Sequence, residues 1–134
     1  MSDLTITITG VDRLFAKLGR IQGTRILREP MDRATKCIQK YMSIYPAELP
    51  NSRYVRTGTL GKRWVAPESI EITESSDGLI GKIGNNTKYA PDVQSRKFQR
   101  KQFKGRWQTD ADAIRDNRAA IVKDFNASIK EALK

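Results

Sequence analysis

Positive charges interleaved with aromatic rings are the feature of this sequence best suited to binding a partner. Residues 96–106 hold six cations and no acid, with Phe98 and Phe103 among them and Trp107 directly after. Cations neutralise phosphates, and aromatic rings stack on bases. Alternatively, the segment is a solvated loop whose rings enter the core. We favour that interpretation for the rings, but partner contact for the cations, because crowded like charges repel each other. These cations are Arg96, Lys97, Arg100, Lys101, Lys104 and Arg106.

A second basic segment, residues 53–66, also lacks acids; its cations are Arg53, Arg56, Lys62 and Arg63. The chain has 25 Lys and Arg and 15 Asp and Glu, and ten of those 25 cations lie in the two segments, so the whole net charge of +10 lies there. Both segments are predicted to be loops or loop edges, which indicates an anionic partner. The glycines near Lys62 do not have the Walker spacing, so a turn is expected rather than a nucleotide site.

The residue types that most enzymes use are missing or scattered. There is no histidine, which removes the commonest general base and leaves the single cysteine, Cys37, without a triad partner. An ordinary His/Cys zinc site cannot be assembled from one chain. Glu68, Glu71 and Glu74 recur every third residue, but on a strand Glu71 points away from the other two. We therefore expect no enzymatic activity, no metal and no cofactor.

Composition sets the scale of the fold. A chain of 134 residues is expected to form one domain, residues 1–134. One cysteine excludes an intramolecular disulfide and fits a cytosolic assembly environment, and on a helical apolar stripe Cys37 is expected in the core. The N-terminus has neither a basic region nor a long apolar run, so no signal peptide or membrane contact is expected.

The elements that must position the basic segments follow from periodicity. Residues 4–9 alternate apolar side chains with threonine, which predicts a half-buried strand. From Val11 to Ile21 the period becomes helical, and Gly23 is expected to end that helix. A second helix is predicted over about 24–44, with Pro30 in its first turn or at a kink.

The second half of the chain is predicted to hold a hairpin and a last helix. Strands are expected over 69–73 and 79–83, joined by a turn at 75–78, with another turn at 84–86. Thr109 is expected to cap the last helix. Its predicted buried stripe is Ile114, Ile121, Phe125, Ile129 and Leu133. The fold class is α+β: a small antiparallel sheet with two or three helices packed on one face, and long basic loops.

Three segments, in order along the chain, resemble the minor tail-component or tail-completion (neck) proteins of siphovirus-type phages. They are Tyr54-Val55-Arg56-Thr57-Gly58-Thr59-Leu60, then Ile83-Gly84-Asn85-Asn86-Thr87-Lys88-Tyr89-Ala90-Pro91-Asp92-Val93-Gln94, then Gly105-Arg106-Trp107-Gln108-Thr109. The most specific part is an Arg-Thr-Gly-x-Leu turn followed by Gly-Asn-x-x-x-Tyr-Ala-Pro. The likeness covers nearly the whole chain.

The resemblance implies a structural virion protein at the head–tail junction, made in the host cytoplasm. Its subunits would form a ring of six copies between the head connector and the tail terminator or tail tube proteins, with a lumen for genomic DNA. The cations of the two basic segments would then face a partner or DNA. The density of cations in residues 96–106 departs from the family pattern, so the segment could either line the channel or dock on another neck protein.

The alternative from another class is a small basic module that binds nucleic acid without sequence preference. Against it, no predicted helix carries a basic recognition face. A nuclease would need metal-binding acids clustered near the basic segments, and the sequence has none there.

Overall fold

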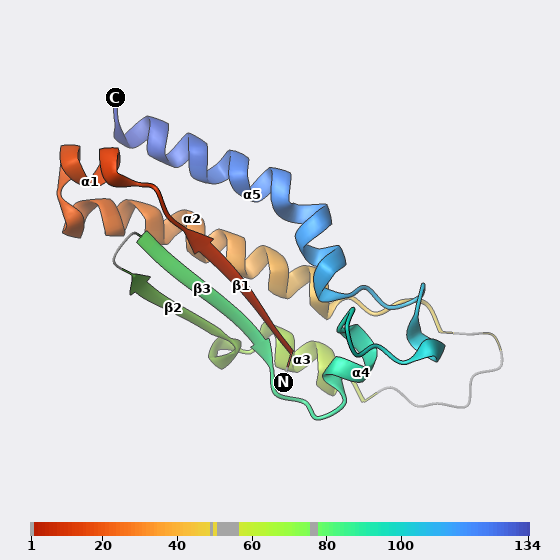
Figure 1. Cartoon of the computed structure of the whole chain (residues 1–134). Coiled ribbons are helices and arrows are strands. Elements are labelled where there is room, and N and C mark those ends of the chain that lie inside the picture. The colour runs from red at the N-terminus through yellow and green to blue at the C-terminus, as the bar shows by residue number, and fades with distance from the viewer. Residues whose placement is uncertain (1, 49, 51–56, 76–77) are drawn as a thin grey trace.

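A computed structural model describes residues 2–48, 50, 57–75 and 78–134. The strands are β1 (Ser2–Ile8), β2 (Ile70–Ser75) and β3 (Gly78–Asn85). The helices are α1 (Asp12–Leu18), α2 (Arg20–Ser43), α3 (Thr59–Val65), α4 (Ala90–Gln94) and α5 (Asp110–Ala132), with 3-10 turns η1 (Pro67–Ser69) and η2 (Lys101–Phe103). The two long helices, α2 and α5, lie side by side against the sheet (Figure 1). The predicted α+β class is confirmed.

The sheet is antiparallel, with β3 between β1 and β2. Leu4 of β1, Ile83 of β3 and Ile70 of β2 form one cross-strand row that faces the helices. The alternation predicted for β1 is therefore confirmed. The turn predicted at 84–86 is wrong in its first two residues, because Gly84 and Asn85 pair with the N-terminal end of β1 and extend β3. The hairpin turn predicted at 75–78 is wrong at both ends, because Ser75 and Gly78 pair as the last residue of β2 and the first of β3. Residues 76 and 77 lie outside the described residues.

The predicted boundary between the first two helices is wrong. The first helix ends at Gly19, whose φ of 81° breaks it, and α2 runs from Arg20 through both Gly23 and Pro30. At position 23 a Cβ would lie 2.4 Å from Cδ1 of Phe15, so glycine here lets α1 pack against α2 rather than ending a helix. Ile21, predicted on the apolar stripe of the first helix, belongs to the first turn of α2 instead and is 81% exposed.

The last helix begins as predicted. The Thr109 side chain accepts from the Asp112 backbone N–H, and the Asp112 carboxylate accepts from that of Thr109, which completes a capping box. The stripe is partly wrong: Ile114 is 47% exposed, and Ala113 is buried in its place. Ala113 lies three turns before the buried Phe125, on the face that packs against α2. Cys37 is half-buried between these helices, where its Sγ donates to Asn117.

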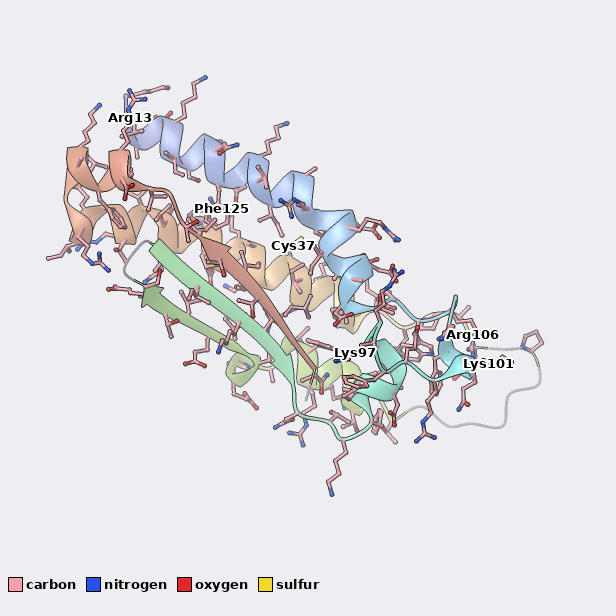
Figure 2. The ribbon with its side chains drawn as sticks, viewed as in Figure 1. Arg13, Cys37, Lys97, Lys101, Arg106 and Phe125 are labelled. Carbon is pink, nitrogen blue, oxygen red and sulfur yellow. The ribbon has the colours of Figure 1, made fainter. Side chains whose placement is uncertain are left out.

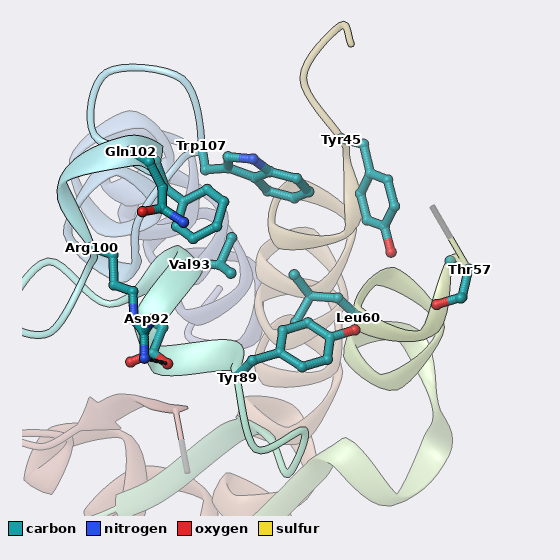
Figure 3. A pocket seen from close by; sticks show the side chains of 11 residues that line it. Tyr45, Thr57, Leu60, Tyr89, Asp92, Val93, Arg100, Gln102 and Trp107 are labelled. Atoms are coloured by element: carbon teal, nitrogen blue, oxygen red, sulfur yellow. Dashed lines mark ion pairs between the residues drawn. The ribbon is translucent and has the colours of Figure 1, made fainter. Parts of the chain in front are cut away.

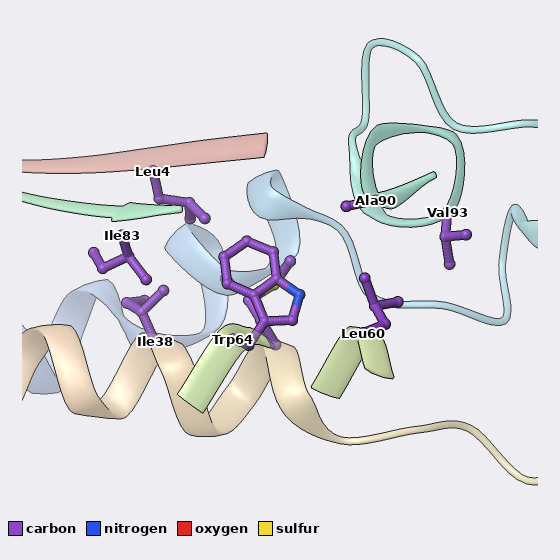
Figure 4. Packing of buried hydrophobic residues seen from close by; sticks show 9 residues of the cluster. Leu4, Ile38, Leu60, Trp64, Ile83, Ala90 and Val93 are labelled. Atoms are coloured by element: carbon purple, nitrogen blue, oxygen red, sulfur yellow. The ribbon is translucent and has the colours of Figure 1, made fainter. Parts of the chain in front are cut away.

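A buried tryptophan joins α3 to the rest of the fold. Trp64 is fully buried in a cluster that includes Leu4, Ile38 and Ile83 (Figure 4). Its indole N–H donates to Oε1 of Gln94 at 2.7 Å, and Nε2 of Gln94 donates to the Met42 carbonyl at 3.0 Å. This buried chain fixes α3, α4 and the end of α2 relative to one another. The three elements frame the site described next.

A candidate interaction site at the basic end

A pocket of about 500 Å³ opens where α3, α4 and the loop after α4 meet (Figure 3). Each of the three segments that carry the family resemblance contributes to its lining: Thr57, Gly58 and Leu60 from the first, Tyr89, Asp92 and Val93 from the second, and Trp107 from the third. The remaining lining residues are Tyr45, Arg100, Gln102 and Phe103. The fold thus brings three distant stretches of sequence to one place.

The pocket walls are mostly apolar and already packed. Leu60 and Val93 belong to the core, and Phe103 and Trp107 pack against it. The Tyr45 and Trp107 rings are 5.1 Å apart between centroids and tilted by 58°. Two of the three rings in or beside the 96–106 segment thus pack against the core, as predicted, whereas Phe98 is 59% exposed.

The 96–106 segment is held in a defined conformation. Nε2 of Gln99 donates to the carbonyls of Val93, Phe103 and Trp107 at 2.6, 3.3 and 3.2 Å. Just beyond the segment, Nε2 of Gln108 donates to the Tyr41 carbonyl at 2.8 Å and so ties the loop to the end of α2. The two side-chain amides thus donate hydrogen bonds to backbone carbonyls, a role that backbone N–H groups fill in regular secondary structure. The predicted basic loop is therefore a built structure that presents its cations from a fixed backbone.

Changing Gln99 to glutamate should release this loop. The carboxylate cannot donate, and three carbonyls would face a negative charge, so we expect local opening to become easier by about 1–3 kcal/mol. Trypsin cleaves after Lys and Arg, so its cleavage within 96–106 should accelerate about ten- to a hundredfold, since cleavage follows the open population. Gln102→Glu is the matched control, because Gln102 is exposed and its side chain has no hydrogen bond recorded among the described residues. Equal cleavage of both variants would show that Gln99 does not hold the loop.

The structure places most of the predicted partner-facing cations at this end of the molecule, and Figure 2 shows Lys97, Lys101 and Arg106 far from Arg13. Arg100 forms an ion pair with Asp92 at 3.4 Å, and the Lys97 ammonium lies 5.3 Å from the centroid of the Phe98 ring. The other described cations in the two segments, Lys62, Arg63, Arg96, Lys101, Lys104 and Arg106, lie beyond ion-pair distance of any described acid. Arg63 instead donates to Asn86 at 3.1 Å. Arg53 and Arg56 lie outside the described residues.

Charges between the long helices are paired instead. Arg33 of α2 makes a bidentate contact with Asp124 of α5 at 2.8 and 3.1 Å. The Tyr41 hydroxyl donates to Asp116 at 2.6 Å. Burial, followed by that hydrogen bond, raises the pKa of Tyr41 to about 12. Hydrogen bonds from Arg115 and then Tyr41 lower the pKa of Asp116. These groups tie α2 to α5, so their role is structural.

The described residues contain no group of three or more His, Cys, Asp or Glu side chains that could hold a metal ion. Within the same part of the chain, no helix is both long and apolar enough to cross a membrane. Comparisons with protein-family models, curated proteins and solved structures give no significant match. The family resemblance therefore depends on the three segments themselves.

Sequence reasoning selected the cations of this site but missed its apolar lining. Tyr45, Tyr89 and Trp107 come from separate segments, and only the fold brings them together around one pocket. The family resemblance was the one feature of the sequence that could have indicated this lining, because its three segments supply most of the lining residues.

Proposed function

We propose that this chain is a structural subunit of a phage head–tail junction. Copies would form a ring that completes the tail and joins it to the head connector, with a lumen through which DNA passes. The observation that carries the proposal is the convergence on one pocket of the three segments that resemble tail-completion proteins.

The charge distribution supports the same role. The two basic segments account for the whole net charge, and Arg100 and Lys62, one from each segment, lie at the pocket. Lys97, Lys101 and Arg106 lie toward the same end of the molecule (Figure 2). A subunit with one cationic end can align with its copies and dock that end on an acidic neighbour, because complementary potentials steer and orient association. The mechanism is steric and electrostatic and needs no chemical step. We assign residues 96–106 to docking and residues 53–63 to the lumen, except for the part of 53–63 that lines or borders the pocket, which we assign to docking.

A sequence-independent nucleic-acid-binding module is the second candidate. Lys101, Lys104 and Arg106 favour it, because none of them pairs with an acid in the described part of the chain. Phosphates would neutralise these cations as well as carboxylates do. The apolar pocket beside them weighs against it, since the sugar–phosphate backbone of duplex DNA has no large apolar group to fill such a site.

Electron microscopy of purified virions tests the proposed function. In particles of the phage that encodes this chain, we expect it as a ring of six copies between the head connector and the tail. Particles grown without the chain should separate into filled heads and free tails, and supplying the chain in trans should restore their joining. A single copy per virion, or complete virions that lack the chain, would contradict the proposal.

A further inference from the structure

We propose that the pocket receives one large apolar side chain from an acidic linear segment of a neighbouring protein. The identification of that neighbour as a junction component rests on the proposed function, whereas the chemistry of the segment rests on the pocket itself. Three properties of the pocket determine that chemistry: its size, its walls and the charge at its mouth.

Size and walls indicate an apolar anchor. A volume of about 500 Å³ lies within the range of sites that enclose a small ligand or one or two large side chains. Leu60 and Val93 are 3% and 7% exposed, and Phe103 completes an apolar floor. Because Gln99 already holds the loop that carries Phe103, this wall is in place before a partner arrives. A preformed wall lowers the ordering cost of binding.

The charge at the mouth indicates acids beside the anchor. The Lys62 side chain packs over Gly58, which lines the pocket, so Lys62 borders the pocket. Its Cε lies 3.7 Å from the position that a Cβ on Gly58 would take. Arg100 lines the other side, where one guanidinium nitrogen meets Asp92 and the other donors remain for a carboxylate. Lys101 is exposed next to the lining residue Gln102. An apolar anchor flanked by Asp or Glu would complement both the floor and the rim.

The wall geometry favours a peptide over a nucleic acid. A base is held best between or upon free aromatic faces, but Tyr45 and Trp107 are tilted by 58° and Trp107 packs against the core. They form a corner rather than a slot for a flat ring. The backbone of duplex DNA could contact the cations at the rim, but it has no large apolar group to fill the pocket.

Selection from a library of short random peptides tests the inference on the full chain. We expect the enriched peptides to share one Phe, Leu or Trp flanked by Asp or Glu. Gln102→Trp, which places a bulky ring over the pocket from an exposed position, and Lys101→Glu should each weaken binding of a selected peptide about tenfold. The matched control is Lys130→Glu, an exposed change near the far end of α5. A thermal midpoint that matches the unmodified chain confirms that the variants are folded.

Several outcomes would overturn the inference: no enrichment, enriched peptides without acids, or peptides that bind both pocket variants at full strength. Binding of a short thymidine oligonucleotide that is lost in Gln102→Trp would also overturn it, by showing that the pocket takes a base. The two proposals fail separately. If the chain forms the junction ring but binds no peptide, only the pocket inference is contradicted. If it binds peptides but is absent from virions, only the proposed junction role is contradicted.

Discussion

Replacing Trp64 by alanine is expected to destabilise the protein by about 3–5 kcal/mol, the cost usual for removing a buried aromatic side chain. Trp64 is fully buried, and its indole donates the hydrogen bond that Gln94 accepts. Natural domains have only about 5–15 kcal/mol of net stability, so this single change removes a large share of it. Urea unfolding followed by circular dichroism should show a midpoint lowered by about 2–3 M.

Trp64→Phe is the informative companion variant. Phenylalanine retains much of the apolar contact but leaves Oε1 of Gln94 without its donor, so we expect a smaller loss of about 1–3 kcal/mol. Because Leu60 lies one turn before Trp64 on α3 and lines the pocket, the alanine variant should also lose the pocket wall. A Trp64→Ala protein as stable as the unmodified chain would show that the cluster around Trp64 does not hold α3 in place.

The sequence correctly predicted those helices and strands that are determined by a pattern of a few neighbouring residues. Alternation in residues 4–9 is sufficient for a strand, and Thr109 with Asp112 is sufficient for a capped helix start. Gly23 was predicted to end a helix, but the reason for a glycine at this position is a tertiary contact. The ring of Phe15, on the preceding helix, occupies the space that a Cβ at position 23 would need. Pro30 was predicted in the first turn of a helix or at a kink; the first alternative is wrong, because Pro30 is buried in the interior of α2, as are Leu27 and Met31. Tertiary packing overrode local propensity at both positions.

The candidate site likewise has one part that the sequence predicted and one part that it did not. Its cations were visible in the sequence, because a run of like charge needs no fold to be recognised. The apolar pocket was not visible, because Leu60, Val93 and Trp107 are far apart along the chain and each looks like an ordinary core residue. The amide that holds the loop was equally hidden, since nothing in the residues around Gln99 indicates which carbonyls it will meet.

Reversing Lys101, Lys104 and Arg106 to glutamate should abolish tail attachment while leaving the fold intact. Arg100 is kept, because a glutamate there would face Asp92. The three changes lower the net charge from +10 to +4, two units for each reversal. Lys101 and Lys104 are exposed, Arg106 is half-buried, and none of the three pairs with a described acid, so the thermal midpoint should stay nearly constant. Docking on an acidic neighbour should weaken at least about a hundredfold, because each opposed charge costs a contact and adds a repulsion. Cells producing this variant should accumulate filled heads beside free tails.

The control reverses Arg13, Arg25 and Lys123, exposed cations of α1, α2 and α5 outside the basic segments, and so makes the same change in net charge. Only the position of the charge then separates the two proteins, and the control should assemble normally. If the 96–106 segment meets DNA instead, the first variant should assemble fully. Its binding to duplex DNA would then depend less steeply on salt, with a log–log slope flatter by about 0.9 for each lost phosphate contact. Complete assembly with an unchanged slope would show that these cations serve neither role, because a docking or DNA-facing surface cannot tolerate a reversal of three charges.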